Sequence, residues 1–290
     1  MQAKSASSSR QVFKMSYDMK ETEDHTIDAE LLGNSILSMS RALRNSDKLI
    51  NGESSNIRVE VRAHEEGSYV VEFVTWLNEG GADVLQVLGI TAGIGAAAKG
   101  TVFGVIEQIK NQKIVAKIRK KDGSVTLKTN AGESIVCDEK VARIVTDQLV
   151  RKELDRVINV PISGKENAKF VLKTENDDEL KVVESDIADN YKALPPKTLT
   201  EMEETTKQVT IYFSQVNFDA ATGWKCKMPD GEIETVRMND EAFRNRINQG
   251  YEEFSKTKPC LVKLKEIVTT KANNTTTTRY TIEEVIRQLG

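Results

Sequence analysis

Aromatic and basic residues are interleaved in the last third of this 290-residue sequence. Aromatic rings stack on bases and lysines neutralise phosphates, so this mixture on neighbouring strands is typical of surfaces that bind single-stranded nucleic acid. The residues predicted to form such a surface are Tyr212, Trp224, Lys225, Lys227, Lys263 and Lys265. Alternatively, the aromatic rings fill a core and the lysines face solvent. Residues 207–290 hold 13 lysines and arginines against 11 acidic residues, and this net charge of +2 is slight for a phosphate-dominated interface.

Small residues recur at helical spacing in the apolar segment 84–109. Residues four positions apart lie on one face of a helix, and small side chains there let a second helix approach closely. The residues predicted to form this helix interface are Gly89, Gly93, Ala97, Gly100 and Gly104. We expect two helices, over about 81–92 and 97–111, that pack inside a domain or between subunits of a homo-oligomer.

The same segment has a second interpretation, as a membrane span. The 23 residues from 84 to 106 are enough to cross a bilayer as a helix. Lys99 lies within this run, and its many small residues lower its hydropathy. Packed helices are therefore our first expectation, and insertion of residues 84–106 into a membrane is the alternative.

Motifs of known catalytic chemistry are missing from the sequence. It has no phosphate-binding loop of P-loop spacing, no Gly-x-Ser-x-Gly and no His-Glu-x-x-His. His25 and His64 stand far from each other, and neither has an evident catalytic partner nearby. We therefore expect a protein that is not an enzyme, with no catalytic residue, no metal site and no cofactor.

Cysteine usage and the N-terminus bear on the compartment. The three cysteines are odd in number and far apart, which is not the pattern of a disulfide framework. The first ten residues are polar and lack the apolar core of a signal peptide. These features predict a cytoplasmic protein, with membrane association as the alternative.

The N-terminal elements predict a helix lying on an antiparallel sheet. Residues 11–20 alternate apolar and polar side chains, as a half-buried strand does. A helix is expected from Thr26 or Asp28, either of which can cap it, to the stop at Asn51-Gly52. Two more strands follow, over 57–63 and 69–77, so this part is of the α+β class.

The remaining elements predict a second α+β segment and a small barrel. Strands are expected within 113–137 and 168–184, with a helix between them that begins at Asp138 and ends before Pro161. The last part reads as three strands, a helix and two strands, which is the order of an OB-type barrel. The expected organisation is a flexible leader over 1–10, an α+β domain over 11–110, a strand-rich α+β segment over 111–192, a linker over 193–206 and an OB-like barrel over 207–290.

Several residues also carry a resemblance to other sequences. In the N-terminal half these are Asp28, Ala29, Leu32, Asn51, Gly52, Val61, Arg62, Ala63, Gly67, Ser68 and Tyr69, and in the C-terminal part they are Trp224, Asp240, Phe243 and Phe254. In this pattern the chain resembles an uncharacterised family of bacteria, phages and prophages. The resemblance implies the architecture and a mobile-element context, and it brings no known activity.

These features together predict a non-enzymatic binding and assembly protein of phage, prophage or defence context. It would form homo-oligomers through its glycine-rich helices and bind a partner, as yet unknown, through the C-terminal barrel. Two alternatives stay open: a membrane-acting protein that inserts residues 84–106, and a single-stranded nucleic-acid binder that uses the barrel.

Overall fold

The computed structural model describes residues 8–23, 26–52, 55, 57–62, 70–78, 83–91, 99–120, 122–195, 200–250, 257–270 and 275–289. The chain forms two compact units. The first consists of Met1–Val115 and Val125–Thr198, and the second of Ala116–Ser124 and Leu199–Gly290. The predicted leader up to residue 7 and both histidines lie outside the described residues.

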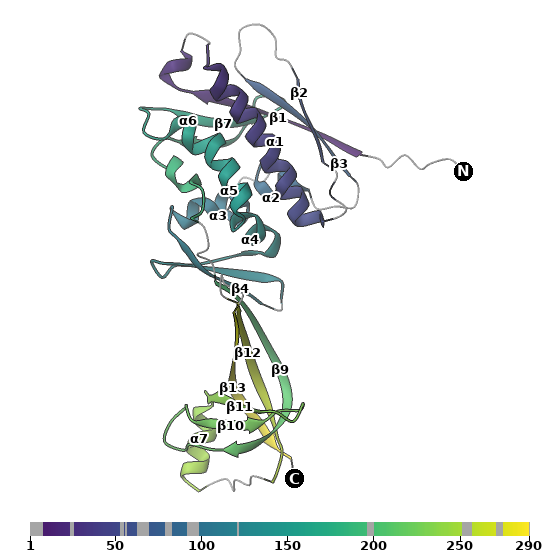
Figure 1. The fold of residues 1–290 in the computed structure, drawn as a ribbon, viewed down its shortest axis with the longest axis vertical. Coiled ribbons are helices and arrows are strands. Elements are labelled where there is room, and N and C mark those ends of the chain that lie inside the picture. Colours follow the sequence, from purple (N-terminus) through teal and green to yellow (C-terminus); the bar gives the residue numbers. More distant parts are fainter. Residues whose placement is uncertain are drawn as a thin grey trace, which may run out of the picture. The chain divides into compact units, whose positions relative to one another are not determined.

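An antiparallel sheet forms one layer of the first unit, with five strands among the described residues (Figure 1). Its order is β2-β3-β1-β7-β8, with every neighbouring pair antiparallel. The strands are β2 (Arg58–Arg62), β3 (Val71–Asn78), β1 (Ser8–Asp18), β7 (Lys169–Thr174) and β8 (Glu179–Glu184). The central strand β1 is therefore bordered on one side by a strand that follows it by some 150 residues, and the sequence-predicted segments 11–110 and 111–192 share one sheet.

Helices cover one face of this sheet (Figure 1). The longest, α1 (Ala29–Asn51), begins where the Asp28 carboxylate accepts the Leu31 N–H at 2.8 Å, and it ends at Gly52, whose φ is 57°. Helix α1 packs against α5, and its buried positions include the small residues Ser38, Ala42 and Ser46. The other elements of this unit are η1 (Lys20–Thr22), α2 (Val84–Leu88), α3 (Val102–Ile109), β5 (Ser124–Thr129), β6 (Ser134–Asp138), α4 (Glu139–Val145), α5 (Gln148–Leu154), the π-helical turn Asp155–Asn159, α6 (Val160–Ile162) and η5 (Ala188–Tyr191).

A buried tyrosine of β1 supports the irregular end of the α5 helix. In an α-helix the N–H of residue 161 would donate to the carbonyl of Val157, but Pro161 has no N–H. The Tyr17 hydroxyl lies 2.7 Å from that carbonyl and 2.8 Å from the Ser35 hydroxyl. Because a carbonyl only accepts, Tyr17 donates to Val157 and accepts from Ser35. The side chain of Tyr17 thus ties the sheet to α1 and to the proline-containing turn.

The second unit is built around a closed barrel. Strands β9 (Thr200–Gln215), β10 (Trp224–Lys227) and β11 (Ile233–Met238) pair antiparallel in sequence, and β11 then pairs in parallel with β13 (Thr276–Gln288). The circuit closes because β13 pairs with β12 (Cys260–Thr270) and β12 with β9. Helix α7 (Glu241–Asn248) separates the third and fourth of these five described strands. The α+β class and the barrel predicted from the sequence are confirmed, and the strand order is compatible with an OB-type barrel.

The barrel core contains a cluster of three aromatic rings. The ring of Phe213 lies edge-on to Trp224 and stacks on Phe243, the inward-facing residue of α7. The Asp240 carboxylate caps α7 through the Phe243 N–H and accepts the N–H of Val285 from β13, so the helix is fixed to the barrel.

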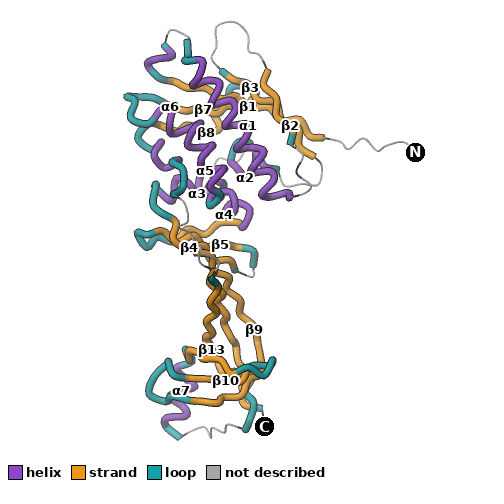
Figure 2. Tube along the Cα trace, viewed as in Figure 1, coloured by secondary structure: helices purple, strands orange, loops and turns teal. Residues whose placement is uncertain are grey.

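Strand β9 begins earlier than the sequence indicates. The predicted linker covers 193–206, but residues 200–206 belong to β9, and residues 201–206 pair with β12 from Thr270 to Lys265. Figure 2 shows β9, β12 and β13 in orange as a ribbon that continues beyond the barrel. At the start of this ribbon, residues 116–119 of β4 (Ile114–Arg119) pair in parallel with residues 200–203. The composition of 200–206 is polar, so only pairing with a distant strand identifies it as a strand.

Candidate functional site

The outer surface of β10 and β11 carries alternate residues of both strands. Trp224 and Cys226 point into the barrel, which leaves Lys225 and Lys227 outside. On β11 the core residues are Val236 and Met238, so the intervening positions face outward. Together with one residue of β9 they make a surface that we call the barrel face: Tyr212, Lys225, Lys227, Ile233, Thr235 and Arg237.

Strand register brings three of these residues into one row. Lys227 pairs with Tyr212 on β9 and with Ile233 on β11. Side chains of directly paired residues lie next to each other on the same side of a sheet. Tyr212 is 43% exposed and Ile233 is 60% exposed, so an aromatic ring, an ammonium group and a branched apolar side chain are all open to solvent. In the row beside them, Lys225 pairs with Thr235 and with Gln215.

The charged residues of the barrel face are all cations, and two acids, Asp230 and Glu232, lie in the turn beside Lys227. Lys225 and Lys227 make no ion pair in the described part of the chain, and Arg237 donates to the neutral Asn239 side chain at 3.1 Å. Glu234 alternates with the outward residues and therefore lies on the inner side of β11, near Cys226. Burial, helped by this carboxylate, raises the pKa of the Cys226 thiol to about 12. The thiol under the barrel face thus stays protonated and is a poor nucleophile.

The loop between β9 and β10 adds a second exposed ring. Phe218 is 38% exposed and lies edge-on to Trp224, with 6.3 Å between the ring centroids. Its carbonyl accepts the side-chain amide of Asn248, and the Trp224 indole N–H donates to the Ala220 carbonyl at 2.9 Å. These bonds fix the loop, so Phe218 is held at the border of the barrel.

The residues predicted from the sequence for nucleic-acid binding separate into three groups. Tyr212, Lys225 and Lys227 lie on the barrel face, while Trp224 is fully buried and serves as a core residue. The other two predicted lysines lie on β12, each beside a carboxylate. Lys265 forms an ion pair with Glu204 at 2.8 Å, and Lys263 pairs with Glu284 across the strands. Sequence reasoning missed Ile233 and Thr235, although their alternation with Val236 and Met238 was a readable signal.

The predicted helix-interface residues lie in a segment that is described only in part. Gly89 ends α2 with a φ of 94°, and a side chain added there would meet the Thr101 hydroxyl at 2.8 Å. Gly104 is buried in α3 and Gly100 is exposed just before it. Gly93 and Ala97 lie outside the described residues. The helices are shorter than predicted: α2 has five residues and α3 has eight. Of the helices that the structure describes, none has both the length and the apolar character needed to cross a bilayer.

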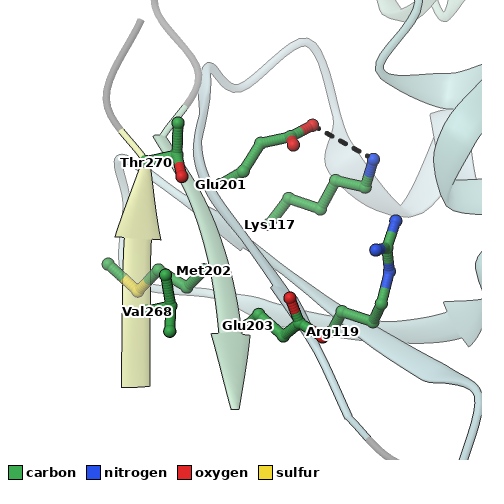
Figure 3. Close-up of a pocket in the computed structure, with 7 residues that line it drawn as sticks. All are labelled: Lys117, Arg119, Glu201, Met202, Glu203, Val268 and Thr270. Carbon is green, nitrogen blue, oxygen red and sulfur yellow. Dashed lines mark hydrogen bonds and ion pairs between the residues drawn. The ribbon is translucent and has the colours of Figure 1, made fainter. Parts of the chain in front are cut away.

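A small cavity of the second unit lies where β4 meets β9 (Figure 3). Lys117 is almost fully buried, and its Nζ lies 3.3 Å from a carboxylate oxygen of Glu201, its partner in the parallel register. The cavity measures about 80 Å³, against roughly 300–1,000 Å³ for pockets that hold small molecules. It has room for a few water molecules, and the ion pair is best explained as part of the sheet. Within the described residues, no cluster of side chains is suited to hold a metal ion.

Comparison with known proteins adds no further information on the site. No family model matches the chain, and neither a curated protein nor a solved structure matches it.

Proposed function

We propose that the barrel binds single-stranded nucleic acid on the face formed by β9, β10 and β11. The observation that carries the proposal is the row of Tyr212, Lys227 and Ile233, an exposed ring and an unpaired ammonium group side by side on paired strands. An exposed ring offers a stacking platform that is tolerant of sequence, and neighbouring cations follow the phosphate backbone.

The position of the row on the barrel also supports the proposal. OB-type barrels bind oligonucleotides and oligosaccharides on the face of their second and third strands. Counted along the chain within this barrel, β10 and β11 are the second and third strands. A base would stack on Tyr212 and contact Ile233, while Lys225, Lys227 and Arg237 would bind phosphates. Three phosphate contacts give an expected slope of about −2 for log K against log salt, so binding is modest and salt-sensitive.

The test uses the full chain and a fluorescent oligothymidine of about 15 nucleotides, a length within reach of one such barrel. Anisotropy at several salt concentrations should give the slope above. Replacing Tyr212 by alanine should weaken binding by about 1–3 kcal/mol, whereas Tyr212→Phe keeps the ring and should bind like the parent. Lys263→Ala is the matched control for Lys227→Ala, because Lys263 lies on β12, outside the barrel face, where its partner in the strand register is Glu284 of β13.

Absence of salt-dependent binding would overturn the proposal. Equal affinity of the parent, Tyr212→Ala and Lys227→Ala would also do so, because binding would then occur elsewhere on the chain. Homo-oligomer formation through the glycine-rich segment and a role in phages, prophages or defence stay predictions. Light scattering across a concentration series tests oligomer formation, and the neighbouring genes bear on the biological role.

A further inference from the structure

A groove in the first unit lies between the end of α1 and the start of α5. It has a volume of about 700 Å³. Its apolar part is formed by Leu49, Ile50 and Leu149. Leu149 is 62% exposed, although it stands on a helix whose other apolar residues are buried. Leu49 and Ile50 are half-buried, and together with the exposed Leu149 they line one depression, which makes a surface suited to contact.

The border of the groove is basic. Arg143 donates from Nη1 to the Leu49 carbonyl at 3.2 Å, which holds its guanidinium at the C-terminal end of α1. Lys48 is exposed and makes no ion pair in the described part of the chain. Asp147 also lines the groove, but its carboxylate caps α5 by accepting the Val150 N–H at 2.8 Å.

Further cations continue this border along both helices. Arg44 precedes Lys48 by four residues, and Lys152 follows Leu149 by three, so each lies one helical turn away on the same stripe. Both are exposed and neither has an ion pair among the described residues. The groove therefore combines an apolar floor with a positive border.

We infer that this groove binds an acidic amphipathic segment of a partner protein. A leucine- or phenylalanine-sized side chain of that segment would fill the space beside Leu49 and Leu149, and flanking carboxylates would reach Lys48 and Arg143. Peptides dock into such grooves through apolar anchors at helical spacing, with charges fixing their register. A phosphate backbone would use the cations and leave the apolar floor uncovered. A lipid surface calls for several protruding apolar side chains, whereas only Leu149 is exposed here and Leu49 and Ile50 are half-buried.

In the test, the immobilised full chain selects binders from a library of displayed random peptides of about 12 residues, which is long enough for three helical turns. We expect the enriched sequences to place aspartate or glutamate beside leucine, isoleucine or phenylalanine. A synthetic peptide of that consensus, measured by anisotropy, should bind Leu149→Ser and Lys48→Glu at least about five-fold more weakly. The matched controls are Leu37→Ser, which changes an exposed leucine of α1 outside the groove, and Lys128→Glu on β5. Both should bind like the parent.

Three results would overturn the inference. The first is enrichment without the acidic and apolar pattern, and the second is a consensus peptide that binds Leu149→Ser and Lys48→Glu as it binds the parent. The third is that no peptide is enriched, while oligothymidine or phosphatidylcholine–phosphatidylserine vesicles bind the parent and bind Lys48→Glu more weakly. Each variant is checked by circular dichroism, and because both altered side chains are exposed we expect the parent spectrum.

Discussion

Replacing Tyr17 by phenylalanine tests how the sheet of the first unit is tied to its helices. The ring is 1% exposed, and its hydroxyl joins the Val157 carbonyl to the Ser35 hydroxyl. Phenylalanine fills the same space and removes only these two hydrogen bonds. A buried carbonyl without its donor costs about 1–3 kcal/mol, and the Ser35 hydroxyl can turn to another acceptor. We therefore expect a loss of about 1–3 kcal/mol in the stability of the first unit.

Hydrogen exchange with mass spectrometry measures this loss in the unit concerned. Peptides that cover β1 and the helical stretch from Gln148 to Ile162 report the opening free energy of that region, and barrel peptides serve as an internal reference. Protection in the first unit should fall, while protection of the barrel should stay unchanged.

A double-mutant cycle with Pro161→Ala tests the physical reason. Alanine restores an N–H that can donate to the Val157 carbonyl in an α-helical turn. Tyr17→Phe should therefore cost about 1 kcal/mol less in the alanine background than in the parent, a coupling typical of residues that share a partner. A cost below about 0.5 kcal/mol in the parent, or equal costs in both backgrounds, would refute the role assigned to the tyrosine hydroxyl.

Three further predictions concern pH, a glycine and a thiol. Burial raises the pKa of Tyr17 above its ordinary value of 10, so this tyrosine ionises first in the unfolded chain, and the parent loses stability as the pH rises above 10. Tyr17→Phe should lessen this loss by up to about 1.4 kcal/mol per pH unit, as measured by urea titrations at pH 9–11. Gly89→Ala should lower the urea midpoint by the equivalent of about 1–3 kcal/mol, because φ is 94° and the new Cβ would lie 2.8 Å from the Thr101 hydroxyl. The control Gly100→Ala places its Cβ in open space and should change the urea midpoint little. The Cys226 thiol should react with a disulfide reagent only after denaturation, since it is buried and its pKa is raised to about 12; rapid modification in the native chain, located by mass spectrometry, would contradict this.

The sequence by itself determined the type of many elements, because local periodicity and capping are written in neighbouring residues. The alternation that places Phe13, Met15 and Tyr17 on one side of β1 corresponds to three buried side chains. The helix from Asp28 to Gly52 could be bounded by its cap and its glycine stop. The order of three strands, a helix and two strands likewise led to the barrel.

Tertiary structure decided which elements meet. Nothing local shows that β1 pairs with β7, or that the polar residues 200–206 extend β9 because β12 continues beside them. The same holds for the barrel face. Composition suggested that Tyr212, Trp224 and Lys227 act together, but strand register puts Lys227 between Tyr212 and Ile233, and alternation turns Trp224 into the core. Periodicity fixes the side of a strand on which a residue lies, whereas its neighbours across the sheet depend on long-range pairing that no local pattern encodes.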